Sequence, residues 1–376
     1  MSGTRRSFYI ILPVFACLIG VLLVELGLAL FYPIPYSLEK NMYFEPDPHT
    51  GYRHRPLGAG TYPNGVSAIA NSQGNRDDVV AIPKPAGVFR ILMIGDSYTV
   101  GANVEQPDVY AQVLERMLNV PGGQPVEVIN AGTGGWSPFQ YAQFLEYYGA
   151  QYEPDLVLVG LFVGNDLIVD RFAPDQTLTA VLGRRMSLEK AADAGITLQV
   201  LAYEYSHIYR ALLRSKPGDM SFVRQSDDCD DFTDLYIALQ TPRAKVHLAQ
   251  QTESDRLLED NNIAEIERMK RKAAELGADF AVVIIPDENQ INPALQAKII
   301  PANEMANYDF SQPQAYLAEQ FAERDIASLD LLDVFRNDPR CLYMNDTHWV
   351  AAGHKLAAEN IRDYLHANNL VPEPAP

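Results

Sequence analysis

Four short segments of the chain carry residue types that together could catalyse acyl transfer through a serine. The first is Gly95-Asp96-Ser97, where a short apolar run ends and a helix is expected to begin. A serine at such a turn presents its hydroxyl to a substrate, and the N-terminus of the next helix stabilises developing negative charge. Taken alone, this tripeptide is more often an ordinary turn and helix cap. Ser97 therefore becomes a candidate nucleophile only in combination with the other three segments.

Two further segments could hold the negatively charged oxygen of an acyl-transfer intermediate. The turn over residues 130–135 is glycine-rich, so the backbone N–H of Gly135 could approach a substrate oxygen without a side chain in the way. Gly164-Asn165-Asp166 follows another apolar run, and the Asn165 amide could donate to the same oxygen. A flexible loop and common turn chemistry explain these two segments equally well when each is considered alone.

The fourth segment places two chemically active side chains two residues apart, Asp346 and His348, directly before the last helical stretch. A histidine beside a carboxylate can act as a general base that the carboxylate orients. A lone histidine here would more often be a surface or packed residue, so this segment too depends on the others.

The combination of the four segments indicates catalysis, because each lies at the end of an expected strand or in a loop on one side of the expected sheet. Ser97 is then the nucleophile, His348 is its general base, and Asp346 is the carboxylate that orients the histidine. The expected oxyanion donors are the backbone N–H groups of Ser97 and Gly135 and the side chain of Asn165.

The elements that must position these residues form an alternating strand and helix pattern. Apolar runs without alternation predict buried strands at residues 89–94, 126–129, 155–162, 279–285 and 328–332. Helical patterns follow at about 109–118, 139–148, 254–276 and 351–367. This order predicts an α/β fold with a parallel sheet covered on both faces, and in such sheets the chemistry lies outside the carboxyl ends of the strands. The residues Pro286-Asp287-Glu288 also follow a strand there and could line a substrate groove, although turn formation explains them more plainly.

These four blocks resemble those of the SGNH, or GDSL-type, hydrolase superfamily. The resemblance covers about residues 86–368 without an insertion at about 170–253, and a segment like Asn71–Asp77 is common in membrane-anchored members. It implies a flavodoxin-like three-layer α/β/α domain and ester chemistry without a metal or an organic cofactor.

Two departures from the family pattern affect what the resemblance implies. Val163 stands where the third block usually has glycine. Family hydrolases usually place the aspartate three residues before the histidine, whereas here Asp346 and His348 are two apart and Trp349 follows. This Asp-x-His-Trp pattern resembles SGNH-like proteins that O-acetylate exopolysaccharides such as alginate, which favours acyl transfer.

The N-terminus predicts a membrane anchor. Residues 8–32 carry one charge, Glu25, and a helix over this range would be about 37 Å long, enough to cross a hydrocarbon core of about 30 Å. Arg5 and Arg6 precede it, so the positive-inside rule places the body of the chain outside the cytoplasm. A cleaved signal peptide is the alternative, but the run is long for one. Glu25 could contact a partner helix or reach the membrane interface.

The expected organisation follows from these segments. The predicted parts are a cytoplasmic tail (1–7), a transmembrane anchor (8–32), a stalk with short strands (33–85), the hydrolase-like domain (86–370) with its insertion (170–253), and a tail (371–376).

Composition narrows the functional classes. The 376 residues hold 30 Lys+Arg against 48 Asp+Glu, a formal net charge of −18, so nucleic-acid binding is excluded as the main task. With only 3 cysteines, a disulfide scaffold or a cysteine-rich zinc module is excluded too. Cys229 and Cys341 could form a disulfide in an oxidising compartment, but the sequence does not show whether they are close.

The sequence thus predicts a single-pass, extracytoplasmic serine esterase or O-acyltransferase, periplasmic or at the cell surface. Its substrate would be an acylated, most simply acetylated, surface glycan or lipid-linked saccharide, and the aromatic faces of Trp136 and Trp349 could stack on sugars. A transferase would need an acyl donor from a membrane acyltransferase partner. The alternative is a catalytically idle scaffold of the same fold that binds a glycan or a partner in an envelope assembly.

Overall fold

The computed structural model of the chain describes residues 3–32, 44–62, 64–168, 178–181, 184–187, 206–214 and 228–373. Residues 33–43 of the predicted stalk and about half of the predicted insertion (170–177, 182–183, 188–205 and 215–227) lie outside these ranges.

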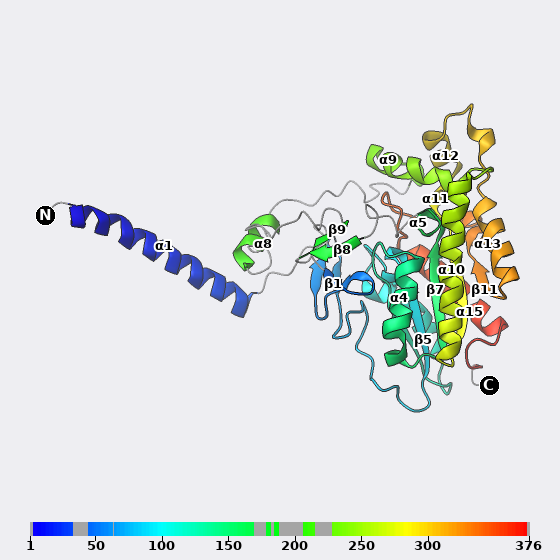
Figure 1. Ribbon diagram of the computed structural model, residues 1–376, viewed down its shortest axis with the longest axis horizontal. Helices are drawn as coiled ribbons and strands as arrows, with labels where there is room; N and C mark the ends of the chain where they lie inside the picture. The colour runs from blue at the N-terminus through cyan, green and yellow to red at the C-terminus, as the bar shows by residue number, and fades with distance from the viewer. Residues whose placement is uncertain are drawn as a thin grey trace.

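A five-stranded parallel sheet forms the centre of the molecule (Figure 1). Its strands are β5 (Phe89–Gly95), β6 (Val126–Asn130), β7 (Leu156–Phe162), β10 (Asp279–Ile285) and β11 (Ala327–Asp330). Their spatial order is β11-β10-β7-β5-β6, and every neighbouring pair is parallel. This is the 2-1-3-4-5 order of flavodoxin-like folds, in which the strand order reverses between the first and third strands. The predicted fold class is confirmed.

Helices cover both faces of the sheet, which explains why the strands are apolar at successive positions. Leu92 and Ile94 of β5 pack into one core cluster, while Ile91 and Met93 pack into the other. The first cluster includes side chains of α4 (Pro138–Tyr148), α10 (Glu253–Glu275) and α13 (Gln312–Glu323). The second includes side chains of α3 (Tyr110–Leu118) and α15 (Ala351–Ala367).

Short elements connect this framework at the ends of the strands. They are α2 (Ser97–Val100), η2 (Gln106–Asp108), η3 (Gly149–Tyr152), α5 (Val163–Asp166), α9 (Asp234–Arg243), η4 (Ala244–His247), α11 (Glu288–Ile291), α12 (Pro293–Ile299), η5 (Met305–Asn307) and α14 (Leu332–Arg336). The predicted strand at 328–332 begins one residue after the start of β11 and ends two residues beyond its end. The Asp330 carboxylate accepts a hydrogen bond from the backbone N–H of Leu332 at 2.9 Å, and this turn ends β11.

The remaining strands form antiparallel pairs outside the main sheet. They are β1 (Phe44–Asp47) with β2 (Gly51–His54), β3 (Ala59–Thr61) with β4 (Ser67–Ile69), and β8 (Leu178–Val181) with β9 (Arg184–Ser187).

The N-terminal helix α1 (Gly3–Phe31) stands apart from the α/β body (Figure 1). Its segment Leu12–Phe31 is long and apolar enough to cross a membrane, although a signal sequence would pass the same test. Glu25 accepts hydrogen bonds from the Ser206 hydroxyl at 2.8 Å and the Ile208 backbone N–H at 3.1 Å. Its carboxylate therefore caps the N-terminus of the short helix α8 (His207–Arg214).

Candidate active site

The predicted nucleophile Ser97 is the first residue of α2, and only Asp96 separates it from the end of β5. Asp96 is the N-cap of that helix, and its Oδ1 accepts a hydrogen bond from the backbone N–H of Tyr98 at 2.8 Å. In the described part of the chain the Ser97 hydroxyl has no hydrogen-bond partner, and the residue is only partly buried. The turn thus holds the hydroxyl at the carboxyl end of the sheet, where a substrate can reach it.

The glycine-rich turn after β6 lies directly against this serine. A Cβ on Gly132 would lie 2.4 Å from the backbone nitrogen of Val100, so only glycine allows the turn to approach α2 this closely. A Cβ placed on Gly134 would be 4.0 Å from the Ser97 Cβ. Gly135, the predicted oxyanion donor, follows in the left-handed region at φ +76°. The structure therefore brings this segment to the serine.

Asn165 lies on the other side of Ser97, in the short helix α5 that follows β7. Its Nδ2 donates to Oδ2 of Asp96 at 3.0 Å, which connects the third predicted block to the first. The amide has a second N–H for a substrate oxygen. Because β5 and β7 are the strands between which the sheet order reverses, Ser97 and Asn165 flank the crevice where such folds bind ligands. Val163, which departs from the family pattern, is fully buried in the core beside them.

Asp346 and His348 lie at the tip of a narrow hairpin. The backbone N–H of Met344 donates to the carbonyl of His348 at 2.7 Å, and that of Val350 donates to Leu342 at 2.9 Å. Oδ2 of Asp346 is 3.0 Å from Nδ1 of His348, and Oδ1 accepts from the His348 backbone N–H at 3.0 Å. A carboxylate oxygen only accepts, so Nδ1 carries the proton and the neutral imidazole has Nε2 as its acceptor.

Contacts of Tyr98 bring this hairpin to the serine turn. Its hydroxyl donates to the Thr347 carbonyl, and its ring centroid is 5.5 Å from that of His348. Nε2 of His348 is buried and has no hydrogen-bond partner within the described ranges. The four predicted blocks therefore meet at one site, with an unbonded acceptor nitrogen next to the turn that carries Ser97.

Three charged groups surround the site. Asp96 and Asp287 are fully buried, and burial raises the pKa of both carboxyls, while the nearby Arg243 guanidinium opposes the shift. Arg243 lies with its Cζ 5.6 Å from the ring centroid of Phe162 at the end of β7, and one guanidinium nitrogen is buried without a partner among the described residues. The site thus holds a cation between two buried acids.

Asp287 follows β10, as the sequence suggested, and reaches the site as well as capping a helix. Its side chain accepts from the backbone N–H of Asn289 and forms a capping box with Gln290. Its Oδ2 lies 2.3 Å from where a Cβ of Gly164 would be. The position next to Asn165 therefore has to be glycine. The turn explanation is confirmed, and a role of Asp287 in a substrate groove stays a prediction.

Sequence reasoning missed Arg243. The residue ends α9 inside what was read as an insertion, and no local motif marks it. Gln240, on the same helix, donates to Asp287 at 3.1 Å, so contacts with the end of β10 hold α9 at the site.

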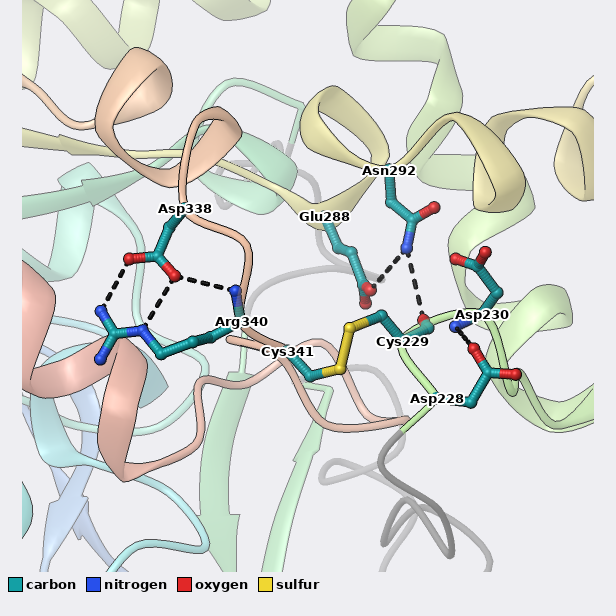
Figure 2. Close-up of a disulfide and its surroundings, with 8 residues drawn as sticks. All are labelled: Asp228, Cys229, Asp230, Glu288, Asn292, Asp338, Arg340 and Cys341. Carbon is teal, nitrogen blue, oxygen red and sulfur yellow. Dashed lines mark hydrogen bonds and ion pairs between the residues drawn. A yellow bond between two sulfur atoms is a disulfide. The ribbon is translucent and has the colours of Figure 1, made fainter.

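A disulfide fastens the segment before α9 to the segment before the hairpin of Asp346 and His348 (Figure 2). Cys229 and Cys341 are joined, with their Cα atoms 5.2 Å apart across a sequence separation of 112. Asn292 donates to the Cys229 carbonyl at 3.4 Å and to Glu288 at 3.3 Å (Figure 2). Asn345, directly before Asp346, donates to the Asp231 carbonyl at 2.9 Å. The end of the predicted insertion is thus held against the hairpin that carries Asp346 and His348.

The prediction that Trp136 and Trp349 bind substrate is wrong for this structure. They are 1% and 0% exposed, and an indole without exposed surface offers no face to a sugar. Nε1 of Trp136 donates to the Tyr52 carbonyl at 3.0 Å inside the core. Trp349 and His348 are adjacent in an extended segment, so their side chains point to opposite sides. The Trp349 ring packs against Phe335, with the two ring centroids 4.8 Å apart.

Metal ligation has no support among the described residues, where no group of three or more His, Cys, Asp or Glu side chains is arranged to hold an ion.

The C-terminal part of the chain is similar in sequence to a known family. Residues 244–375 match a family described as the SGNH hydrolase-like domain of the acetyltransferase AlgX. This part of the chain is similar to that domain. The match includes Asp346 and His348 and starts after Ser97 and Asn165. It confirms the resemblance found in the sequence, and it supports an enzyme of the ester hydrolase or O-acetyltransferase type.

Several solved structures align over most of the chain at low sequence identity. TesA is 14% identical, with a TM-score of 0.41, and the alignment covers 75% of this chain and 99% of that chain. A lipase/acylhydrolase from Enterococcus faecalis is 15% identical (TM-score 0.37; 76% and 100% covered). An acetyl-xylooligosaccharide esterase from Geobacillus is 14% identical (TM-score 0.39; 74% and 94% covered). No curated protein shows significant sequence similarity.

Proposed function

We propose that this SGNH hydrolase-like chain is a membrane-anchored serine esterase or O-acyltransferase that works through an acyl-enzyme on Ser97. Its substrate is an acetyl ester of a surface glycan or lipid-linked saccharide. One observation carries the proposal. His348 is held by Asp346 through Nδ1 at 3.0 Å, and its Nε2 is buried without a partner among the described residues, next to the turn of Ser97.

Acylation follows from this arrangement. Nε2 of His348 takes the proton of Ser97 as the hydroxyl oxygen attacks the acyl carbonyl. The backbone N–H groups of Ser97 and Gly135 and the free N–H of the Asn165 amide hold the resulting oxyanion. When the intermediate collapses, the imidazolium returns its proton to the leaving alcohol, and the acyl group remains on Ser97.

Deacylation decides between the two activities. The neutral imidazole of His348 takes a proton from water in an esterase or from a sugar hydroxyl in a transferase, and that oxygen attacks the acyl-enzyme. The residues are the same in both branches. The Asp-x-His-Trp pattern and the acetyltransferase named for the matched family support the transferase branch. The acyl donor, and a membrane acyltransferase partner that would supply it, stay predictions.

Placement outside the cytoplasm is supported by two independent features. Arg5 and Arg6 precede the apolar helix, which is the charge pattern of a cytoplasmic N-terminus. The disulfide between Cys229 and Cys341 fits an oxidising compartment, since thiols stay reduced in the cytosol.

The test uses the full chain in detergent, as wild type and as Ser97→Ala and His348→Ala. Acetate release from 4-nitrophenyl acetate is followed with and without an oligosaccharide acceptor. We expect each variant to lose roughly 10³-fold or more in kcat. Transfer of acetyl to the oligosaccharide would identify the transferase branch.

Ser328→Ala, on the edge strand β11, is the matched control and should keep wild-type activity. Wild-type activity in Ser97→Ala would contradict the assignment. A folded wild type without any release would favour the idle binding role.

A further inference from the structure

Asn103 lies outside the four blocks, yet it contacts the carboxylate of Asp346, the predicted partner of His348. Its Nδ2 donates to Oδ2 of Asp346 at 2.6 Å, and this is the same oxygen that faces Nδ1 of His348 at 3.0 Å. Asn103 is 8% exposed and comes from the loop between α2 and η2. We propose that Asn103 is a positioning residue that holds Asp346 in the orientation in which it supports His348. This inference rests on the proposed function of the site.

The hydrogen bonds on Asp346 leave little room for other orientations. Oδ1 accepts from the backbone N–H of His348 at 3.0 Å, so one oxygen is held by the hairpin itself. Oδ2 accepts from the histidine ring and from Asn103. Because hydrogen bonds to a charged group are about twice as strong as neutral ones, the asparagine contributes strongly to fixing this oxygen. Without it, the hydrogen bonds that orient the carboxylate, among the residues that the structure describes, would all lie within residues 346–348.

The asparagine amide has one sensible orientation here. A carboxylate only accepts hydrogen bonds, so the NH₂ end of Asn103 must face Asp346. The opposite end, Oδ1, is buried and has no partner among the residues that the structure describes. A buried acceptor without a partner costs free energy. We infer that this cost is kept because the other end of the amide performs a function.

Arg76 fixes the backbone around Asn103. The Arg76 side chain is buried, and its guanidinium donates to the carbonyls of Val100 at 3.0 Å, Gly101 at 2.5 Å and Val104 at 2.6 Å. Asn64 Nδ2 donates to the Asn103 carbonyl itself at 2.7 Å. The loop is therefore held on both sides of Asn103.

The backbone conformation explains why asparagine stands at this position. Its φ is +64°, a left-handed conformation that asparagine tolerates and most other side chains do not. The contacts of Arg76 with this loop suggest a role for the Asn71–Asp77 segment. Through Arg76, the segment holds the loop so that the Asn103 amide faces Asp346, which lies far from it in sequence.

The experiment compares Asn103→Gly, Asn103→Asp and Asn369→Gly with the wild-type full chain in detergent. Glycine accepts the positive φ and removes the amide, and aspartate keeps the size but replaces the donor with an acceptor. Asn369 is an exposed asparagine at φ +55°, so Asn369→Gly makes the same exchange away from the site. We expect Asn103→Gly to lower kcat by roughly tenfold or more with KM within about twofold. Asn103→Asp should lower kcat at least as much, because two carboxylates would then face each other.

Two further measurements separate this inference from a structural role and from the proposed function. Asn103→Gly loses a buried hydrogen bond to a carboxylate and should melt below Asn369→Gly, but both variants should be fully folded at the assay temperature, so that their kcat values compare folded molecules. The low-field NMR signal of the His348 Nδ1 proton, assigned by its absence in His348→Ala, should shift in both Asn103 variants and not in Asn369→Gly. An unchanged signal and a kcat equal to that of Asn369→Gly would overturn the inference. If the wild type shows no turnover that depends on Ser97, the proposed function fails, and the NMR signal still tests whether Asn103 positions the pair.

Discussion

The two ends of the parallel strands hold similar polar groups in opposite ways. At the amino end, the buried guanidinium of Arg90 donates from all three nitrogens, to Glu127 at 2.5 Å and to the carbonyls of Tyr152 at 2.8 Å and Ala81 at 3.0 Å. Asp155 beside it accepts from the Arg90 backbone N–H and from Lys84, each at 2.7 Å. Polar groups at this end pair with one another.

At the carboxyl end, buried polar atoms lack partners within the described residues. They are Nε2 of His348, Oδ1 of Asn165, Oδ2 of Asp287 and one guanidinium nitrogen of Arg243. Most buried polar groups in proteins are hydrogen-bonded, and exceptions need an explanation. The contrast indicates that the amino end is built for stability, whereas the carboxyl end holds groups ready for a substrate.

Among the changes that compare the two ends, removing the Asn165 amide should give the largest effect. We expect Asn165→Ala to lower kcat by about 10²–10³-fold, since one oxyanion donor is lost. The matched change at the amino end, Asn119→Ala, removes an amide that pairs with the backbone of Val126 and should leave kcat unchanged. Both are measured as acetyl ester hydrolysis by the full chain. If Asn165→Ala stays within threefold of wild type, the amide serves only to hold Asp96, and the contrast between the two ends loses its catalytic meaning.

Removing Arg90 should have the reverse signature. We expect Arg90→Leu to lower the free energy of unfolding by about 3 kcal/mol, because Glu127 and two carbonyls lose their partner. Its kcat per folded molecule should equal that of wild type. Chemical denaturation provides the stability, and Arg362→Leu, an exposed pair with Asp363, is the control with a change below about 0.5 kcal/mol. A loss of kcat at full folding would show that this end also serves catalysis.

Asp77 offers the smallest and most specific test, because it is a partly buried acid at the carboxyl end of β6. Its Oδ2 accepts from the backbone N–H of Asn130 at 2.7 Å, and burial raises its pKa to about 7. Between about pH 4 and 7 the unfolded chain releases this proton while the folded chain keeps it. The free energy of unfolding of the wild type should therefore fall as pH rises through this window, by up to roughly 1 kcal/mol per pH unit.

Asp77→Asn removes this titration. Its stability relative to wild type should rise between about pH 4 and 7 and stay level above that range. The measurement is a series of unfolding curves of both proteins at several pH values. Parallel curves across the window would mean that the Asp77 carboxyl is not protonated in the folded state.

Local patterns in the sequence were enough to find the strands and the residues at their ends. Ser97 and Asn165 each come shortly after an apolar run. The carboxyl ends of parallel strands meet at one edge of the sheet, so strand direction alone predicts that the two residues are close in space. The pairing of a carboxylate with a histidine was predictable because Asp346 and His348 are two residues apart. Asn103 and Arg243 had no such signal. Asn103 reaches Asp346 across 243 positions, and neither stands in a recognisable motif.

The tryptophans show the limit of reasoning from proximity in sequence. Trp349 follows His348 directly, and this made it a candidate for sugar stacking. Adjacent residues of an extended segment point to opposite sides, so the property that exposes His348 to the site buries Trp349 in the core.

By itself, the sequence determined the parallel α/β fold, the apolar N-terminal helix and the four blocks that carry serine chemistry, because apolar periodicity and turn residues act over a few neighbouring positions. Only the tertiary structure decided how the blocks are held together. The contact of Tyr98 with Thr347, the amide of Asn103 on Asp346 and the disulfide between Cys229 and Cys341 join positions more than 100 residues apart. Such contacts depend on the packing of whole elements against the sheet, and no local pattern encodes that packing.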